Sequence, residues 1–376
     1  MAKIIGMPEL EIVFRHLGAT ALRRGEKGQA ILVVKEEKEG LPVITLPTYN
    51  SFNDDLQKTF SEKNVKYIKD TLKMQPKELI VVRMNTADEG LADETEEGIN
   101  SLNDALTFLG TKAERNCWIS VAEITKEESE ELALFVSEKN KFDKKRYKAV
   151  VYQHDADDMH VVNFTTPKVK MKDGEELIEG VELIPLMLGA IAGQSLNSSL
   201  IAKKFTDIEY VIEPEDKDTA VDKGELFLFN DDGAVRIGRA VNSLTTIEEG
   251  MTNDMRFILI VEVMDLIFTD IHFAWTENYK GKYKNILDNQ MLFVSAINSY
   301  FAGLENDNIL DNAYENNAEI NVEKQRLANI PLYGEEEVGG WDNNRVLEMT
   351  VGTNVYLGAQ IKIPNAMEDL FVDILI

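Results

Sequence analysis

Apolar and polar positions follow two periods over the first half of the chain. Short apolar runs predict strands, and the segments between them place apolar side chains at helical spacing. The predicted strands are Ile31–Val34, Leu79–Arg83, Trp118–Ala122 and Lys148–Tyr152, and the predicted helices lie near residues 65–72 and at Lys126–Lys139. Strands that alternate with helices predict an α/β layer with parallel strands.

The second half of the chain changes to longer helices and paired strands. A helix of small and apolar residues is predicted at Leu183–Leu196, and Asp-Gly between two apolar runs then predicts a hairpin. The remaining predicted elements are the hairpin strands at 224–230 and 234–241, helices at 255–278 and 292–304, an acidic linker at 305–319, and strands at 346–351, 354–363 and 370–376.

Two segments of the first hundred residues stand apart from this pattern. Leu10, Ile12 and Phe14 occupy alternate positions, which is the period of a strand, and glycines follow from Gly18 onward. Such a strand pairs with its own sheet or with a neighbour's, and the pattern leaves both open. The acidic segment Asp88–Glu97 predicts a solvated loop or a helix start.

Composition and charge exclude several classes of protein. The chain has 376 residues, of which 66 are acidic and 40 basic, so its net charge is −26. A length of this kind indicates two or three domains. The acidity argues against binding to nucleic acid or to an anionic membrane surface. The single cysteine, Cys117, excludes intrachain disulfides and Cys-based zinc sites and fits a reducing cytoplasm, and the N-terminus lacks the pattern of a signal peptide.

The most apolar stretch, Phe257–Ala274, raises the question of a membrane span. It contains Glu262, Asp265 and Asp270. A membrane span would bury all three carboxylates in hydrocarbon, so the stretch predicts a buried helix of a globular domain.

Candidate chemistry is sparse. His154 and His160 flank acidic residues of metal-ligating type, but their spacing matches no metal signature, and the segment predicts an exposed turn. His272 lies in an apolar helix and predicts a packed core histidine, and the sequence around Ser195 lacks the last glycine of a nucleophile elbow. The sequence therefore predicts no catalytic, cofactor-binding or metal-ligating residue, no cofactor and no enzyme.

Four stretches resemble the contractile tail sheath proteins of Gram-positive phages, prophage-like elements and phage-tail-like bacteriocins. They are VRIGRAVNSLTT (Val235 to Thr246), MDLIFTDIHFAWTENYKGKYKN (Met264 to Asn285), FVSAINSYFAGL (Phe293 to Leu304) and VYLGAQIKIPNAMEDLFVDILI (Val355 to Ile376). Asn365 stands where the family commonly has Asp. GAIAGQSLNSSL (Gly189 to Leu200) and the start of the chain resemble the family more weakly.

The resemblance implies a structural subunit that polymerises as stacked hexameric rings around an inner tube and contracts to drive the tube through a cell envelope. The implied partners are further copies of the chain, the inner tail tube protein, and baseplate and tail-terminator proteins, without nucleic acid or membrane insertion. Assembly in the bacterial cytoplasm, then presence in a phage tail or a released tail-like particle, is implied. The alternatives are a sheath subunit of a type VI secretion or extracellular injection system, and an α/β hydrolase that would have to use His154 or His160.

The implied architecture is mixed α/β and multi-domain. It comprises an N-terminal arm (1–25), an α/β segment (26–95), a subtilisin-like α/β sheath domain (96–250), and a C-terminal helix-plus-sheet domain (251–376) that ends in a strand arm from about residue 365. Main-chain pairing between subunits combines strength with hinged movement. The expected strand-exchange interface residues are Leu10, Ile12, Phe14, Leu370, Phe371, Val372 and Ile374.

Overall fold

The computed structural model describes residues 22, 28–86 and 99–375. The chain divides into two compact units. The sheet unit comprises residues 25–269 and 363–376, and the helix unit comprises residues 1–24 and 270–362. The predicted strand around Leu10, Ile12 and Phe14 and the acidic segment Asp88–Glu97 lie outside the described residues.

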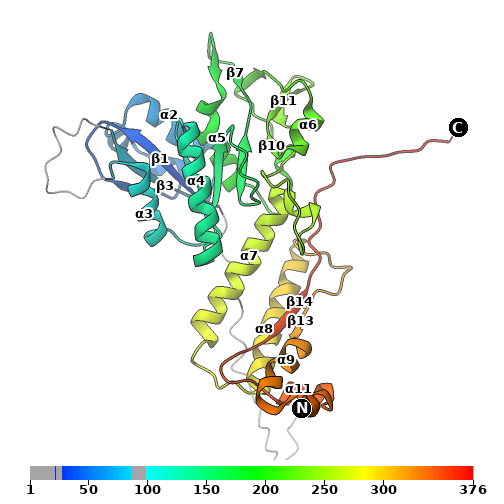
Figure 1. Cartoon of the computed structure of the whole chain (residues 1–376). Coiled ribbons are helices and arrows are strands. Elements are labelled where there is room, and N and C mark those ends of the chain that lie inside the picture. The colour runs from blue at the N-terminus through cyan, green and yellow to red at the C-terminus, as the bar shows by residue number, and fades with distance from the viewer. Residues whose placement is uncertain (1–21, 23–27, 87–98, 376) are drawn as a thin grey trace, which may run out of the picture. The chain divides into compact units, whose positions relative to one another are not determined.

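The sheet unit is built on a seven-stranded sheet of order β10-β6-β5-β4-β1-β3-β2 (Figure 1). Its strands are β1 Gln29–Glu36, β2 Val43–Leu46, β3 Glu78–Asn85, β4 Trp118–Val121, β5 Lys148–Tyr152, β6 Val161–Phe164 and β10 Glu225–Leu226. All neighbours pair in parallel except β2 with β3. The prediction of a parallel α/β layer is confirmed. One sheet thus takes strands from both sides of residue 95, where the sequence predicted a boundary.

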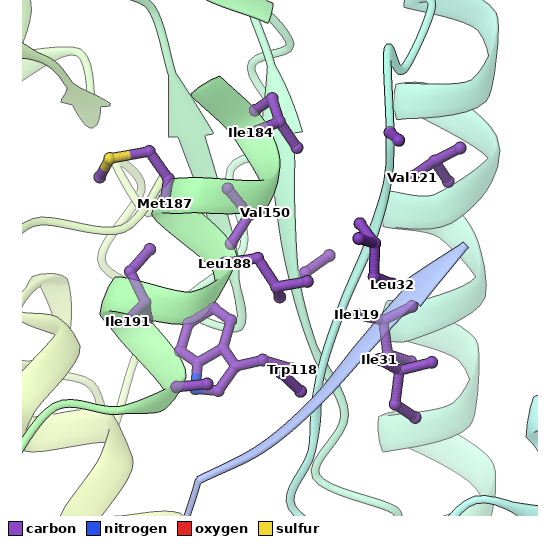
Figure 2. Close-up of a cluster of buried hydrophobic side chains, with 14 of the residues drawn as sticks. Ile31, Leu32, Trp118, Ile119, Val121, Val150, Ile184, Met187, Leu188 and Ile191 are labelled. Atoms are coloured by element: carbon purple, nitrogen blue, oxygen red, sulfur yellow. The ribbon is translucent and has the colours of Figure 1, made fainter. Parts of the chain in front are cut away.

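Helices cover the sheet and bury its central strands. They are α1 Asp54–Gln57, α2 Glu62–Lys73, α3 Leu102–Lys112, α4 Lys126–Glu138 and α5 Ile184–Ala192. Residues 30–34 of β1 are completely buried, as an apolar run with partners on both faces should be. Figure 2 shows Leu188 and Ile191 of α5 beside Trp118 of β4 within this core.

The small residues of α5 allow it to approach α2 closely. A Cβ on Gly189 would lie 2.3 Å from the carbonyl oxygen of Thr71, far inside contact distance. The Thr71 hydroxyl donates a hydrogen bond of 2.9 Å to the carbonyl of Pro185. The small-residue stretch is therefore explained by helix packing inside the sheet unit.

Smaller sheets complete this unit. The predicted hairpin is confirmed as β11 Leu228–Asp231 and β12 Ala234–Ile237. Asp232 and Gly233 both have positive φ, the geometry that two-residue hairpin turns require. A three-stranded sheet of order β8-β7-β9 contains β7 Lys168–Met171, β8 Leu177–Glu179 and β9 Ile208–Val211, and α6 is Lys217–Asp222.

The helix unit contains the later elements. α7 Ile258–Ala274 begins in the sheet unit. The elements that follow are α8 Leu287–Asn306, α9 Val322–Tyr333, α10 Glu335–Gly339, α11 Asn343–Glu348 and the antiparallel pair β13 Asn317–Ile320 and β14 Leu357–Gln360. Both predicted long helices are confirmed. The described residues contain no helix long and apolar enough to cross a membrane.

Two strand predictions need correction. The predicted strand at 346–351 is wrong, because Asp342 caps α11 there through the amide of Arg345 at 2.7 Å. The strand predicted at 354–363 is limited to β14, and β13 occupies the end of the predicted acidic linker. Residues 370–375 form no strand within the subunit. The mixed α/β class is confirmed, and the division into domains at exact residues remains a prediction.

Candidate functional site: a C-terminal arm and a buried charged cluster

The end of the chain is an exposed apolar segment, here called the arm (residues 370–375). Leu370, Phe371 and Leu375 are 86%, 93% and 98% exposed, and Val372 and Ile374 are exposed as well. The arm leaves the sheet unit as an extended trace without helix or strand partners (Figure 1). Contiguous apolar surface of this kind marks an interaction site. Four of the predicted interface residues thus lie together in one exposed segment; Leu10, Ile12 and Phe14 lie outside the described residues.

A second surface suited to strand pairing is the two-stranded sheet of the helix unit. β13 and β14 pair over four residues, from Asn317 opposite Gln360 to Ile320 opposite Leu357. β14 has one hydrogen-bonded neighbour among the described residues, so its outer edge is open, whereas the outer edge of β13 faces α8. The side chain of Asn298 on α8 bonds to both the amide and the carbonyl of Ala318, which fixes β13 on α8.

Titratable groups converge at one place in the sheet unit, here called the charged cluster (Arg146, Lys148, Asp158, His160, Glu262 and Asp265). Lys148 Nζ lies 2.5 Å from a carboxylate oxygen of Glu262, and both side chains are 1% exposed. Trp118 Nε1 donates to the same carboxylate at 2.9 Å, and Lys148 lies 3.7 Å from Asp265. Lys148 also bonds to the side chain of Asn116. The cluster attaches the first half of α7 to β4 and β5.

His160 extends the cluster toward the start of β6. Its Nε2 lies 3.3 Å from Asp265 and its Nδ1 3.4 Å from Asp158. Burial alone would lower the pKa of His160, but the two carboxylates outweigh burial and raise it to about 9. Burial would raise the pKa of Asp158, but its bond to His160 lowers it. Both shifts describe an imidazolium held between two carboxylates.

The remaining members of the cluster balance its charge. Arg146 Nε lies 3.7 Å from Asp265, and the guanidinium stacks 3.9 Å from the centre of the Phe268 ring. With the histidine protonated, Arg146, Lys148 and His160 face Asp158, Glu262 and Asp265. Four members of this network are buried and Arg146 and Asp158 are partly exposed, and equal numbers of opposite charges are what structural ion pairing requires. The charged cluster therefore attaches α7 to β4 and β5.

The structure corrects two predictions about histidine. The segment around His154 and His160 was predicted to be an exposed turn, but His160 is buried because Asp158 and, from α7, Asp265 neutralise it. His272 was predicted to be a packed core residue, but it is only half-buried and its Nδ1 lies 3.2 Å from the Thr276 hydroxyl. Ser195 is exposed and accepts a bond from the amide of Asn197. Among the described residues, no group of three His, Cys, Asp or Glu side chains could hold a metal ion.

One sequence signal could have located the charged cluster. Glu262 and Asp265 are three residues apart, so they share one face of an apolar helix and need cationic partners there. Nothing in the sequence identifies Lys148 and His160 as these partners, because they lie more than 100 positions away.

Comparisons with known proteins agree with this fold. Residues 251–376 match the family described as the phage tail sheath C-terminal domain. Over 379 aligned residues the chain is 27% identical to the tail sheath protein of Clostridium phage phiCD119, covering 97% of this chain and 98% of the relative.

Two solved structures show the same fold. The sheath tail protein of Desulfitobacterium hafniense aligns with a TM-score of 0.64 and 16% identity over 85% of this chain and 93% of its own. The contracted helical sheath protein of the anti-feeding prophage aligns with a TM-score of 0.67 and 10% identity over 99% of both chains. The chain therefore has the fold of the solved sheath proteins. The chain is similar to tail sheath proteins along its whole length, and residues 251–376 carry the match to the phage tail sheath C-terminal domain.

Proposed function

We propose that the chain polymerises into stacked hexameric rings around an inner tube, with the arm as a strand that each subunit donates to a neighbour. The observation that carries the proposal is the exposure of five apolar side chains in one terminal segment. Burying them against another subunit would favour association by about 1.5–3 kcal/mol for each side chain that becomes fully buried.

The open edge of β14 is the surface we propose for strand addition. A two-stranded sheet is marginal by itself and gains main-chain hydrogen bonds when further strands join it. The N-terminal residues Leu10, Ile12 and Phe14 are proposed as a second donated strand. Main-chain pairing holds subunits together while the chain around the strands bends, as contraction requires.

The further partners follow from the same proposal. We propose contacts with the inner tube protein, the baseplate and the tail terminator, with assembly in the bacterial cytoplasm before the particle is released. The related anti-feeding prophage protein has been solved as part of a baseplate. We propose a structural and not a catalytic role, because four members of the charged cluster are buried and the cluster consists of mutually neutralising ion pairs.

Concentration-dependent polymerisation tests the proposal. Purified protein should give tubes or sheath-like polymers in negative-stain images when concentrated, and Phe371→Glu should prevent them. Phe142→Glu is the matched control, since Phe142 is 72% exposed on the sheet unit but lies outside the arm. Polymers from the Phe371 variant at the wild-type concentration would refute the role of the arm.

A further inference from the structure

The segment just before the arm is bound to the body of the sheet unit. Arg239 Nη2 donates to a carboxylate oxygen of Asp369 at 2.7 Å, and its Nη1 lies 3.7 Å from Glu368. Both acids immediately precede the arm in sequence. The two contacts therefore hold the chain at the residue from which its apolar end departs.

Arg239 is mounted on a rigid part of the unit. It lies two residues after the end of β12, and the next two residues, Ala240 and Val241, are buried. The carbonyl of Ala240 accepts a bond from the amide of Ile258 at the start of α7, and Val241 bridges to Phe257. Because the backbone is fixed on both sides, the guanidinium has a defined position.

The acid pair lies in a groove that also includes Asp254 and Phe257. Arg239 is the single cation among the residues that line it, where three carboxylates meet. The side chain of Glu368 is only 6% exposed, and neither of its oxygens has a hydrogen-bond partner among the described residues. A buried carboxylate with so few partners depends strongly on the one nearby cation.

The position from which the arm leaves the subunit affects how readily a donated strand reaches a neighbour. The residues just before the arm, 367–369, are here called the root. A freely moving root would let the arm search a large volume, whereas a bound root restricts the search and raises the effective concentration of the arm at a neighbour. The stretches Val235 to Thr246 and Val355 to Ile376, which resemble the sheath family separately in sequence, meet at this contact.

We propose that Arg239 and its groove form an intramolecular docking site for the Glu368–Asp369 acid pair, and that Arg239 is a positioning residue that sets where the arm leaves the subunit. The inference rests on the proposed function for its consequence in assembly, but docking itself is a property of the single subunit.

The mobility of the root in the dilute full-length chain tests the docking. Met367→Cys places a spin label on a fully exposed side chain beside the acid pair, while Cys117 is buried and burial raises its pKa to about 12, so it does not compete. The label should become mobile in the Arg239→Glu variant and in 1 M salt, since screening weakens a partly exposed ion pair. The charge swap of Arg239→Glu with Asp369→Arg should restore much of the immobilisation.

Arg236→Glu is the matched control, because Arg236 lies three residues away on β12 and pairs with Asp231 of the hairpin. It should leave the label unchanged. Equal mobility in the wild type and the Arg239→Glu variant would overturn the docking site, as would a mobile label in the charge swap.

Assembly is measured separately on unlabelled protein. Arg239→Glu should raise the concentration at which polymers appear at least tenfold, and the charge swap should lower it again. An unchanged concentration despite a mobile root would refute the positioning role. Polymers from a chain that lacks the arm would instead refute the proposed function, while the result with the single subunit would stand.

Discussion

Deleting residues 370–376 distinguishes two possibilities: the arm is part of the core of its own subunit, or it is donated to a neighbour. The deletion begins after Asp369, so the contact between Arg239 and the acid pair is retained. A strand in the core of its own subunit would bury five apolar side chains, worth about 7–15 kcal/mol together. That range is comparable to the whole stability of a typical domain, about 5–15 kcal/mol.

The observed exposures lead to a much smaller value. The apolar side chains of the arm range from 63% exposed at Val372 to 98% at Leu375. Their buried fractions together are less than one fully buried side chain, about 1–2 kcal/mol at most. The truncated subunit should therefore melt within a few degrees of the full-length monomer and fail to polymerise.

Thermal unfolding followed by circular dichroism, at a concentration where both proteins are monomeric, measures the first outcome, and negative-stain imaging at high concentration measures the second. Phe301→Ala provides a positive control, because this ring is 1% exposed in the helix unit and its loss should cost about 3–5 kcal/mol. A truncated chain that melts as early as this control would show that the arm belongs to the fold of its own subunit. A truncated chain that still polymerises would refute strand donation.

Three further predictions concern the interior. Lys148→Met should cost about 3–5 kcal/mol in urea unfolding, because Glu262 loses its buried cation, and adding Glu262→Leu should recover much of that loss. The pKa of His160 is raised to about 9, so protonated His160 stabilises the fold by roughly 3 kcal/mol. This contribution is complete below pH 6.5 and is lost as pH rises through 9. His160→Gln should remove this part of the pH dependence of stability between about pH 6 and 10. Gly189→Ala should destabilise by about 1–3 kcal/mol, whereas Gly303→Ala, in α8 with open space around it, should stabilise by up to about 1 kcal/mol in the same thermal assay.

The elements of the sheet unit could be predicted because local pattern and tertiary environment agree there. β1 and β3 are apolar runs buried on both faces, and α2 places its apolar residues on one face. The hairpin of β11 and β12 was predictable for a different reason, since Asp232 and Gly233 tolerate the left-handed backbone that its turn needs.

Predictions failed where distant residues decide the structure. The segment from Val346 to Met349 reads as a strand, but the Gln325 side chain on α9 donates to the carbonyl of Val346 at 2.6 Å, and that of Asn329 to Met349 at 2.9 Å. His160 lies in a polar segment that predicts exposure, yet Asp265 is 3.3 Å away after the chain folds. No local pattern contains these partners.

The arm presents a different case, because its composition predicts a strand and its subunit supplies no partner. An exposed apolar end is also an aggregation hazard, and two features oppose indiscriminate association. Asp373 interrupts the apolar run, as charged residues do in natural edge strands, and the chain carries a net charge of −26 that makes subunits repel one another.

Salt should then have opposite effects on the two steps of assembly. It reduces repulsion between subunits and also weakens the contact of Arg239 with the acid pair, so polymerisation should be fastest at an intermediate ionic strength, and the Arg239→Glu variant should lose the decline at high salt.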